Sequence, residues 1–107
     1  MIQVVFDRGA YRVTVVGHAG AEEVGKDLVC AGASALCYTL AANVGEFVRR
    51  GMLRRAHVEM KSGKAEILCV PKGKFQRQVR DSLEAVCLGF SLLGEQFPNF
   101  LSYKVVG

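Results

Sequence analysis

The chain has 107 residues, of which 50% are hydrophobic and 22% are charged, and its formal net charge is +4 at pH 7. This composition excludes a disordered tail, and the length allows one hydrophobic core with little room for a second. We therefore expect a single domain over residues 1–107. The N-terminus lacks the charged start and long apolar run of a signal peptide, and the apolar-rich region Leu28–Val48 contains Asn43 and Glu46. These features predict a cytoplasmic protein without a membrane-spanning segment.

The N-terminal part of the chain is predicted to form a β-hairpin followed by a loop. Ile2–Phe6 and Tyr11–Val16 are rich in β-branched and aromatic residues, and the turn sequence 7–9 lies between them. Residues 17–26, GHAGAEEVGK, come next. This stretch contains three glycines: Gly17, Gly20 and Gly25. So many glycines predict a mobile loop.

The first predicted helix covers Leu28–Arg50, with Asp27 as its N-cap and Gly51 as its stop. Apolar residues at helical spacing form its core stripe: Val29, Ala33, Leu36, Leu40, Val44 and Phe47. A neighbouring stripe consists of small residues: Cys30, Ser34, Ala41 and Gly45. Small side chains leave room for another group to approach this face of the helix.

The second half of the chain is predicted to form two strands, a helix and a last strand. Arg55–Met60 and Ala65–Pro71 are predicted strands joined by a turn at residues 62–63, and Lys74–Phe97 is a predicted helix. A last strand covers Phe100–Val106. The order β-β-α-β-β-α-β, with two amphipathic helices and five strands, predicts an α+β fold, a two-layer α/β sandwich.

The four cysteines, Cys30, Cys37, Cys69 and Cys87, are expected to be free thiols. The nearest two are seven residues apart, unlike the close pairs of zinc sites, and the chain is too poor in cysteine for a secreted disulfide scaffold. His18, Cys30 and Cys37 contain no chelating pair. The sequence therefore predicts no metal and no cofactor.

Cys30 and His18 are the candidate nucleophile and general base. Cys30 falls in the first turn of the predicted helix, where free N–H groups and the helix dipole favour a thiolate. His18 follows the end of a strand, on a loop that returns to the same helix. From there an imidazole can take the thiol proton and later protonate the leaving amine.

Two further polar residues flank Cys30. Asp27 is interpreted as a helix N-cap, and the alternative is a carboxylate that orients the ring of His18. Its negative charge would disfavour a thiolate close by, which argues against the catalytic alternative. Ser34 lies one turn after Cys30 on the same face, and its hydroxyl either serves the site or bonds its own helix backbone.

The segment from residue 17 to residue 36 resembles the ribosomal-processing cysteine protease family known as Prp. The resemblance rests on Gly17-His18-Ala19, on Gly25-x-Asp27-x-Val29-Cys30-Ala31, and on Ser34 and Leu36. It covers essentially the whole chain. The family's His and Cys fall on His18 and Cys30, its Asp on Asp27 and its Ser on Ser34.

The resemblance implies both a fold and an activity. The fold has two helices on one side of a five-stranded sheet, usually in a homodimer. The activity removes a short N-terminal extension from a bacterial large-subunit ribosomal protein precursor. Because the extension of the family's substrate is apolar and aromatic near the cut, an apolar groove is expected. The glycine-rich loop would close over the bound peptide.

Two groups of cations are interpreted first as solvated helix ends and alternatively as a contact with nucleic acid or a ribonucleoprotein. One group is Arg49, Arg50, Arg54 and Arg55, and the other is Lys72, Lys74, Arg77 and Arg80. No feature of the sequence supports direct RNA contact further, and no membrane partner is expected.

Two rival functions follow from the same residues. One is a non-enzymatic basic binding module that assists ribosome assembly. The other is a thiol-redox protein that uses Cys30 and Cys37. The seven-residue spacing makes that disulfide difficult, because it corresponds to a rise of about 10.5 Å along a helix.

Overall fold

The structure is a computed structural model that describes residues 1–18 and 26–107, and of Lys26 and Asp27 the backbone alone. It contains β1 (Ile2–Asp7), β2 (Arg12–Val16), α1 (Lys26–Arg49), β3 (Leu53–Lys61), β4 (Lys64–Pro71), a 3₁₀ turn η1 (Gly73–Phe75), α2 (Gln76–Gln96) and β5 (Leu101–Val106). The predicted order of strands and helices is confirmed.

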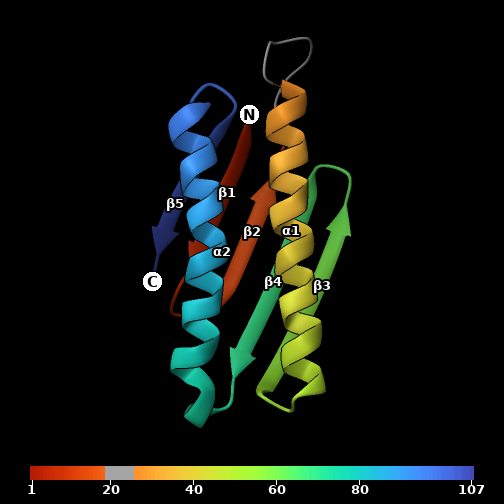
Figure 1. The fold of residues 1–107 in the computed structure, drawn as a ribbon, viewed down its shortest axis with the longest axis vertical. Helices are drawn as coiled ribbons and strands as arrows, with labels where there is room; N and C mark the ends of the chain where they lie inside the picture. Colours follow the sequence, from red (N-terminus) through yellow and green to blue (C-terminus); the bar gives the residue numbers. More distant parts are fainter. Residues whose placement is uncertain (19–25) are drawn as a thin grey trace.

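The strands form one open sheet in the order β3-β4-β2-β1-β5. β5 runs parallel to β1, and the other neighbouring pairs are antiparallel. Both helices cover the same face of the sheet (Figure 1). The predicted α+β sandwich with two helices on one side is therefore confirmed.

Alternation of side chains along the strands builds the core between the sheet and the helices. Ile2, Val4 and Phe6 of β1 are buried, as are Val13 and Val15 of β2. Because successive side chains of a strand point to opposite faces, these residues lie on one face of the sheet. The β1–β2 register pairs Val4 with Val15 and Phe6 with Val13, so the apolar side chains of the two strands lie next to each other.

The buried face of α1 differs from the predicted core stripe at one position. Cys37 is buried, whereas Leu36 is only partly buried and packs against the core from its side. Leu36 instead meets α2 at Gly89, where an added Cβ would lie 2.6 Å from Leu36 Cδ2. Leu93 of α2 meets Gly32 of α1 in the same way, at 3.1 Å. The helix–helix contact therefore draws Leu36 away from the sheet and leaves that position to Cys37.

Helix α1 is long and apolar enough by composition to cross a membrane over Leu28–Arg49, with a mean hydropathy of 1.5. The core helix of a soluble protein can meet the same criteria, and 28% of this apolar window is buried inside the molecule. Six residues of α1 lie in the hydrophobic core with the sheet: Val29, Ala33, Cys37, Leu40, Val44 and Phe47.

Candidate active site

One cleft of about 440 Å³ lies where the end of β2, the N-terminal half of α1 and the β3–β4 turn meet. His18 reaches it from the residues after β2, and Cys30 and Ser34 reach it from α1. The structure therefore brings four of the sequence-predicted site residues into one cavity, because Gly17 lines it as well. They come from opposite sides of residues 19–25, which lie outside the described part of the chain.

Cys30 lies two residues further into its helix than the sequence predicts. Because α1 begins at Lys26, Cys30 is its fifth residue, and the free N–H groups of the helix belong to the residues before it. The dipole effect falls off within the first turn, so it acts on Cys30 less directly than expected. The thiol is half-buried and packs beside the core while facing the cleft.

Asp27 is the second residue of α1 and so does not precede the helix as the predicted N-cap. A carboxylate within the first turn is also favoured by the helix dipole, which explains why a cap signal and a first-turn position look alike in the sequence. The side chain of Asp27 lies outside the described residues, as do Gly20 and Gly25 of the predicted mobile loop. An Asp27–His18 contact stays a prediction.

His18 is exposed and lies against the β3–β4 turn. The amide of Gly17 donates a hydrogen bond to the carbonyl of Gly63 at 2.8 Å. A Cβ on Gly63 would lie only 2.7 Å from Nε2 of His18, so the imidazole packs directly on this glycine. Gly63 also has φ +77°, which favours glycine. Sequence reasoning assigned Gly63 only to a turn and missed its contact with the candidate base.

Gly17 has a defined place between two strands. Its φ is +108°, and an added Cβ would lie 2.3 Å from the carbonyl oxygen of Met1. No side chain fits there, so the glycine lets β2 end close to the start of β1. The contacts with Met1 and Gly63 direct the next residue, His18, toward the cleft.

The exposed face of α1 continues the cleft beyond Cys30. Ser34 and Tyr38 follow at intervals of four residues, and both line the cavity. Among the described residues Ser34 makes no hydrogen bond to its own helix, whereas Thr39 donates to the carbonyl of Ala35 at 2.8 Å. Tyr38 was not among the predicted site residues, although its spacing of eight from Cys30 places it on the same face.

The sequence model of the cysteine protease Prp family matches residues 1–102. The chain belongs to the Prp family. It is therefore a cysteine protease, and the resemblance noted in the sequence is confirmed.

Solved structures show the same fold as this Prp family member. SMU.848 from Streptococcus mutans is 28% identical, with a TM-score of 0.68 over 99% of this chain and 94% of that one. Prp from S. aureus in complex with a substrate peptide is 20% identical, with a TM-score of 0.75 over 98% and 99%. The same protease with a covalently linked product peptide is 23% identical, with a TM-score of 0.71 over 98% and 99%. No curated protein matches the sequence.

The other cysteines of this Prp family member differ from Cys30 in burial. Burial raises the pKa of Cys69 and of Cys87 to about 11 and also raises that of Cys37. Their thiols stay protonated at neutral pH, and a protonated thiol is a poor nucleophile. Cys37 also lines the cleft, from a buried position. Within residues 1–18 and 28–107, no three His, Cys, Asp or Glu side chains gather as metal ligands.

Proposed function

We propose that this protease removes the N-terminal extension of a bacterial large-subunit ribosomal protein precursor, with Cys30 as nucleophile and His18 as general base. The observation that carries the proposal is that Cys30 and His18 line one cleft. Of the four cysteines, Cys30 alone is not buried.

The proposed reaction passes through a thioester. His18 takes the proton of the Cys30 thiol, and the thiolate sulfur attacks the carbonyl carbon of the scissile bond. The imidazolium then gives its proton to the leaving amine as the C–N bond breaks. In the second half His18 takes a proton from water, and the hydroxide attacks the thioester. The C–S bond breaks, the carboxylic acid product leaves, and the proton returns to the Cys30 sulfur.

His18 carries most of the activation of the thiol in this proposal. Cys30 is the fifth residue of α1, so the helix dipole alone is a weak source of thiolate. Packing of the imidazole on Gly63 keeps the ring beside the cleft. A hydrogen bond from the second imidazole nitrogen of His18 to the carboxylate of Asp27 would also orient the ring.

The cleft suits an extended peptide with apolar side chains. Tyr38 and Met60 line it and are 67% and 36% exposed, so a bound side chain can bury apolar surface against them. Ile2 and Val15 form part of its floor. The S. aureus structures, which hold a substrate peptide and a covalently linked product peptide, support a peptide substrate for this fold.

Mass spectrometry of the precursor after incubation with the protein tests this function. We expect loss of the N-terminal extension with the parent protein and none with Cys30→Ala or Cys30→Ser. Cys69→Ala is the matched control, because it removes a thiol from the core and should leave cleavage intact. Cleavage by the Cys30 variants at the parent rate would refute the assignment, and an uncut precursor would refute the proposed substrate.

We also propose that the protease acts in the cytoplasm as a homodimer. A second cleft of about 360 Å³ between α2 and β5 is lined in part by Leu88 and Val105, which are 59% and 48% exposed. Apolar surface of this kind supports self-association through α2 and β5. Sedimentation equilibrium tests it, and a monomer at micromolar concentration would contradict it.

A further inference from the structure

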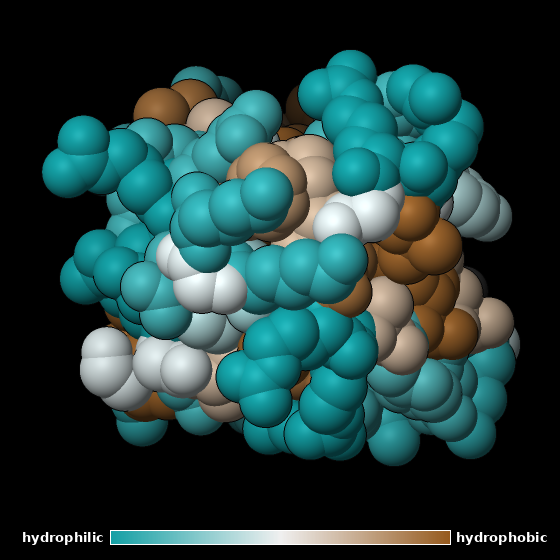
Figure 2. All heavy atoms as spheres, turned by 90° about the horizontal axis from the view of Figure 1, so that it is seen from below, coloured by the Kyte–Doolittle hydropathy of each residue, from teal (hydrophilic) through white to brown (hydrophobic). Residues whose placement is uncertain are grey.

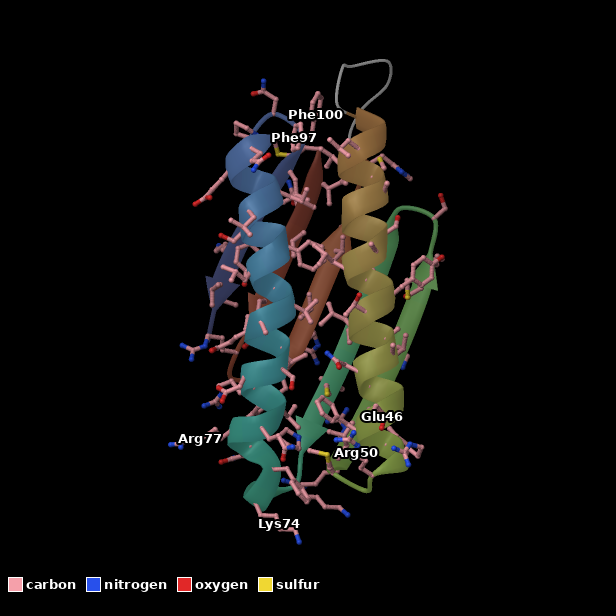
Figure 3. The ribbon with its side chains drawn as sticks, in the orientation of Figure 1. Glu46, Arg50, Lys74, Arg77, Phe97 and Phe100 are labelled. Atoms are coloured by element: carbon pink, nitrogen blue, oxygen red, sulfur yellow. The ribbon has the colours of Figure 1, made fainter. Side chains whose placement is uncertain are left out.

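The structure joins the two groups of cations into one surface, which we term the basic end: residues 46–55 and 72–77. The amide of Lys72 donates a hydrogen bond to the carbonyl of Met52 at 2.9 Å, and Leu53 pairs with Pro71 in the sheet. The end of α1, the start of β3 and the start of α2 therefore meet. Figure 3 shows Arg50, Lys74 and Arg77 together at this end.

The basic end holds all of the excess positive charge of the chain. It contains seven cations and one acid, a formal charge of +6, while the whole chain carries +4 and all other residues together carry −2. The seven cations are exposed: Arg49, Arg50, Arg54, Arg55, Lys72, Lys74 and Arg77. Seen along the long axis in Figure 2, hydrophilic side chains cover most of this face.

Ion pairs neutralise little of this charge. Glu46 is the acid of the basic end, and it pairs with Arg49 and with Arg50, whose Nε lies 3.0 Å from its Oε1. Within the described parts of the chain, the other five cations have no ion-pair partner. A β-bulge at Arg54 breaks the alternation of β3, and both Arg54 and Arg55 are exposed.

Helix stability explains the positions of only two of these cations. Attraction to a helix C-terminus accounts for Arg49, the last residue of α1, and for Arg50, which follows it. Lys74 and Arg77 instead lie at the N-terminal end of α2, where the helix dipole disfavours cations, and no acid occupies the first turn of that helix. Positive charges at positions where the helix dipole disfavours them indicate that an anionic partner binds there.

We propose that the basic end binds the phosphate backbone of RNA and so holds the protease on the particle that contains its substrate. The choice of RNA over other polyanions rests on the proposed function in ribosomal protein processing. Five of the seven cations are arginines, whose planar guanidinium groups match phosphate oxygens. A membrane surface fits less well, because Phe47 is buried and Val48 is the one large apolar side chain exposed in these segments.

The position of the basic end leaves the active site open while RNA is bound. Cys30 and Arg49 lie nineteen residues apart on α1, which corresponds to about 28 Å along the helix. The cleft lies near the N-terminus of α1 and the basic end at its C-terminus, at opposite ends of the molecule (Figure 1). A protein precursor bound near RNA can then enter the cleft without displacing the contact.

Fluorescence anisotropy with a labelled single-stranded RNA of about 20 nucleotides tests the proposal. We expect a dissociation constant of about 1–100 μM near physiological salt and an affinity that falls steeply as salt rises. If all seven cations contact phosphates, the slope of log affinity against log salt is about −5, from roughly 0.7 for each contact to a single strand.

The variant Lys74→Glu with Arg77→Glu removes two of these contacts and places acids where the dipole of α2 favours them, so the protein should stay folded. We expect RNA affinity to fall at least about tenfold and the salt slope to weaken by about 1.4. The matched control, Lys61→Glu with Lys104→Glu, makes the same charge change elsewhere and should retain RNA affinity within about twofold. Arg54→Gln with Arg55→Gln tests the other half of the surface without reversing charge.

Three results would overturn the proposal: no RNA binding by the parent, equal weakening by the test and control variants, or binding to phosphatidylserine vesicles without binding to RNA. Cleavage of a short substrate peptide, measured in parallel, should be unchanged by Lys74→Glu with Arg77→Glu. RNA binding without peptide cleavage would refute the proposed function alone. Peptide cleavage without RNA binding would refute the RNA contact alone.

Discussion

At the scale of single residues, exposure separates Cys30 from the other three cysteines. Cys69 and Cys87 are fully buried, and burial raises the pKa of each to about 11. We therefore predict that iodoacetamide at pH 7 modifies Cys30 in the folded protein and leaves Cys69 and Cys87 unmodified. His18→Ala should slow the modification of Cys30 in the presence of a non-cleavable peptide, because the thiol loses its proton acceptor. Peptide mapping by mass spectrometry gives the rate at each site.

The same experiment tests the role of His18 as activating base. Modification of Cys30 at the parent rate in His18→Ala, both free and with peptide bound, would show that another group activates the thiol. Cys69 and Cys87 should react with the reagent only after the protein is unfolded in urea. Their modification in urea is the control showing that burial protects them in the folded protein.

Gly63 offers a test of the position of the imidazole. Gly63→Ala would place a Cβ 2.7 Å from Nε2 of His18, whereas at Gly51 an added Cβ meets nothing within 4 Å. Both glycines have positive φ, +77° and +69°, so both substitutions should destabilise the fold by about 1–2 kcal/mol. Gly63→Ala alone should lower kcat/KM, by roughly 10- to 100-fold, because it displaces the base. Equal activity of the two variants would show that His18 does not act from this position.

At the scale of helices and strands, the glycines of α1 and α2 differ in their surroundings. Gly45 on α1 is exposed, and a Cβ there would meet nothing within 4 Å, while a Cβ on Gly89 of α2 would lie 2.6 Å from Leu36. Gly45→Ala should therefore stabilise the protein by about 0.8–1 kcal/mol, the ordinary difference in helix propensity. Gly89→Ala should gain less, because Leu36 must move. Urea unfolding measures both, and a larger gain for Gly89→Ala would contradict the close helix contact.

At the scale of the whole molecule, buried thiols make the fold sensitive to base. The pKa of Cys69 and that of Cys87 are raised from 9.0 to about 11, so the folded protein holds these protons more tightly than the unfolded chain does. Their stabilising effect is complete below pH 9 and is lost as the pH rises toward 11. We predict a fall in the free energy of unfolding between pH 8.5 and pH 10.5, of about 1 kcal/mol for each thiol by pH 10.

Urea unfolding of the parent and of Cys69→Ala with Cys87→Ala checks this pH dependence. The double variant is less stable at pH 7 because it leaves cavities, but its stability should fall less between pH 8.5 and pH 10.5. An equally steep fall in both proteins would assign the base sensitivity to other groups.

Local patterns in the sequence account for the secondary structure and for the two central residues of the site. Runs rich in β-branched and aromatic residues predicted the N-terminal strands, helical spacing predicted both helices, and the motif around His18 and Cys30 predicted the family. These features depend on neighbours within a few residues, so the sequence carries them directly. The start of α1 was placed two residues too late, because an aspartate is favoured both as an N-cap and within the first turn.

The tertiary structure alone decided which distant residues meet. The contact between His18 and Gly63 depends on β2 pairing with β4, and the joining of the two groups of cations depends on the pairing of β3 with β4. Cys37 occupies the core position predicted for Leu36 because α2 approaches α1 closely at Gly89. The sequence by itself determined the strands, the helices and the chemical groups of the site. Sheet register and helix packing determined their surroundings, because these bring together residues whose separation along the chain says nothing about their distance in space.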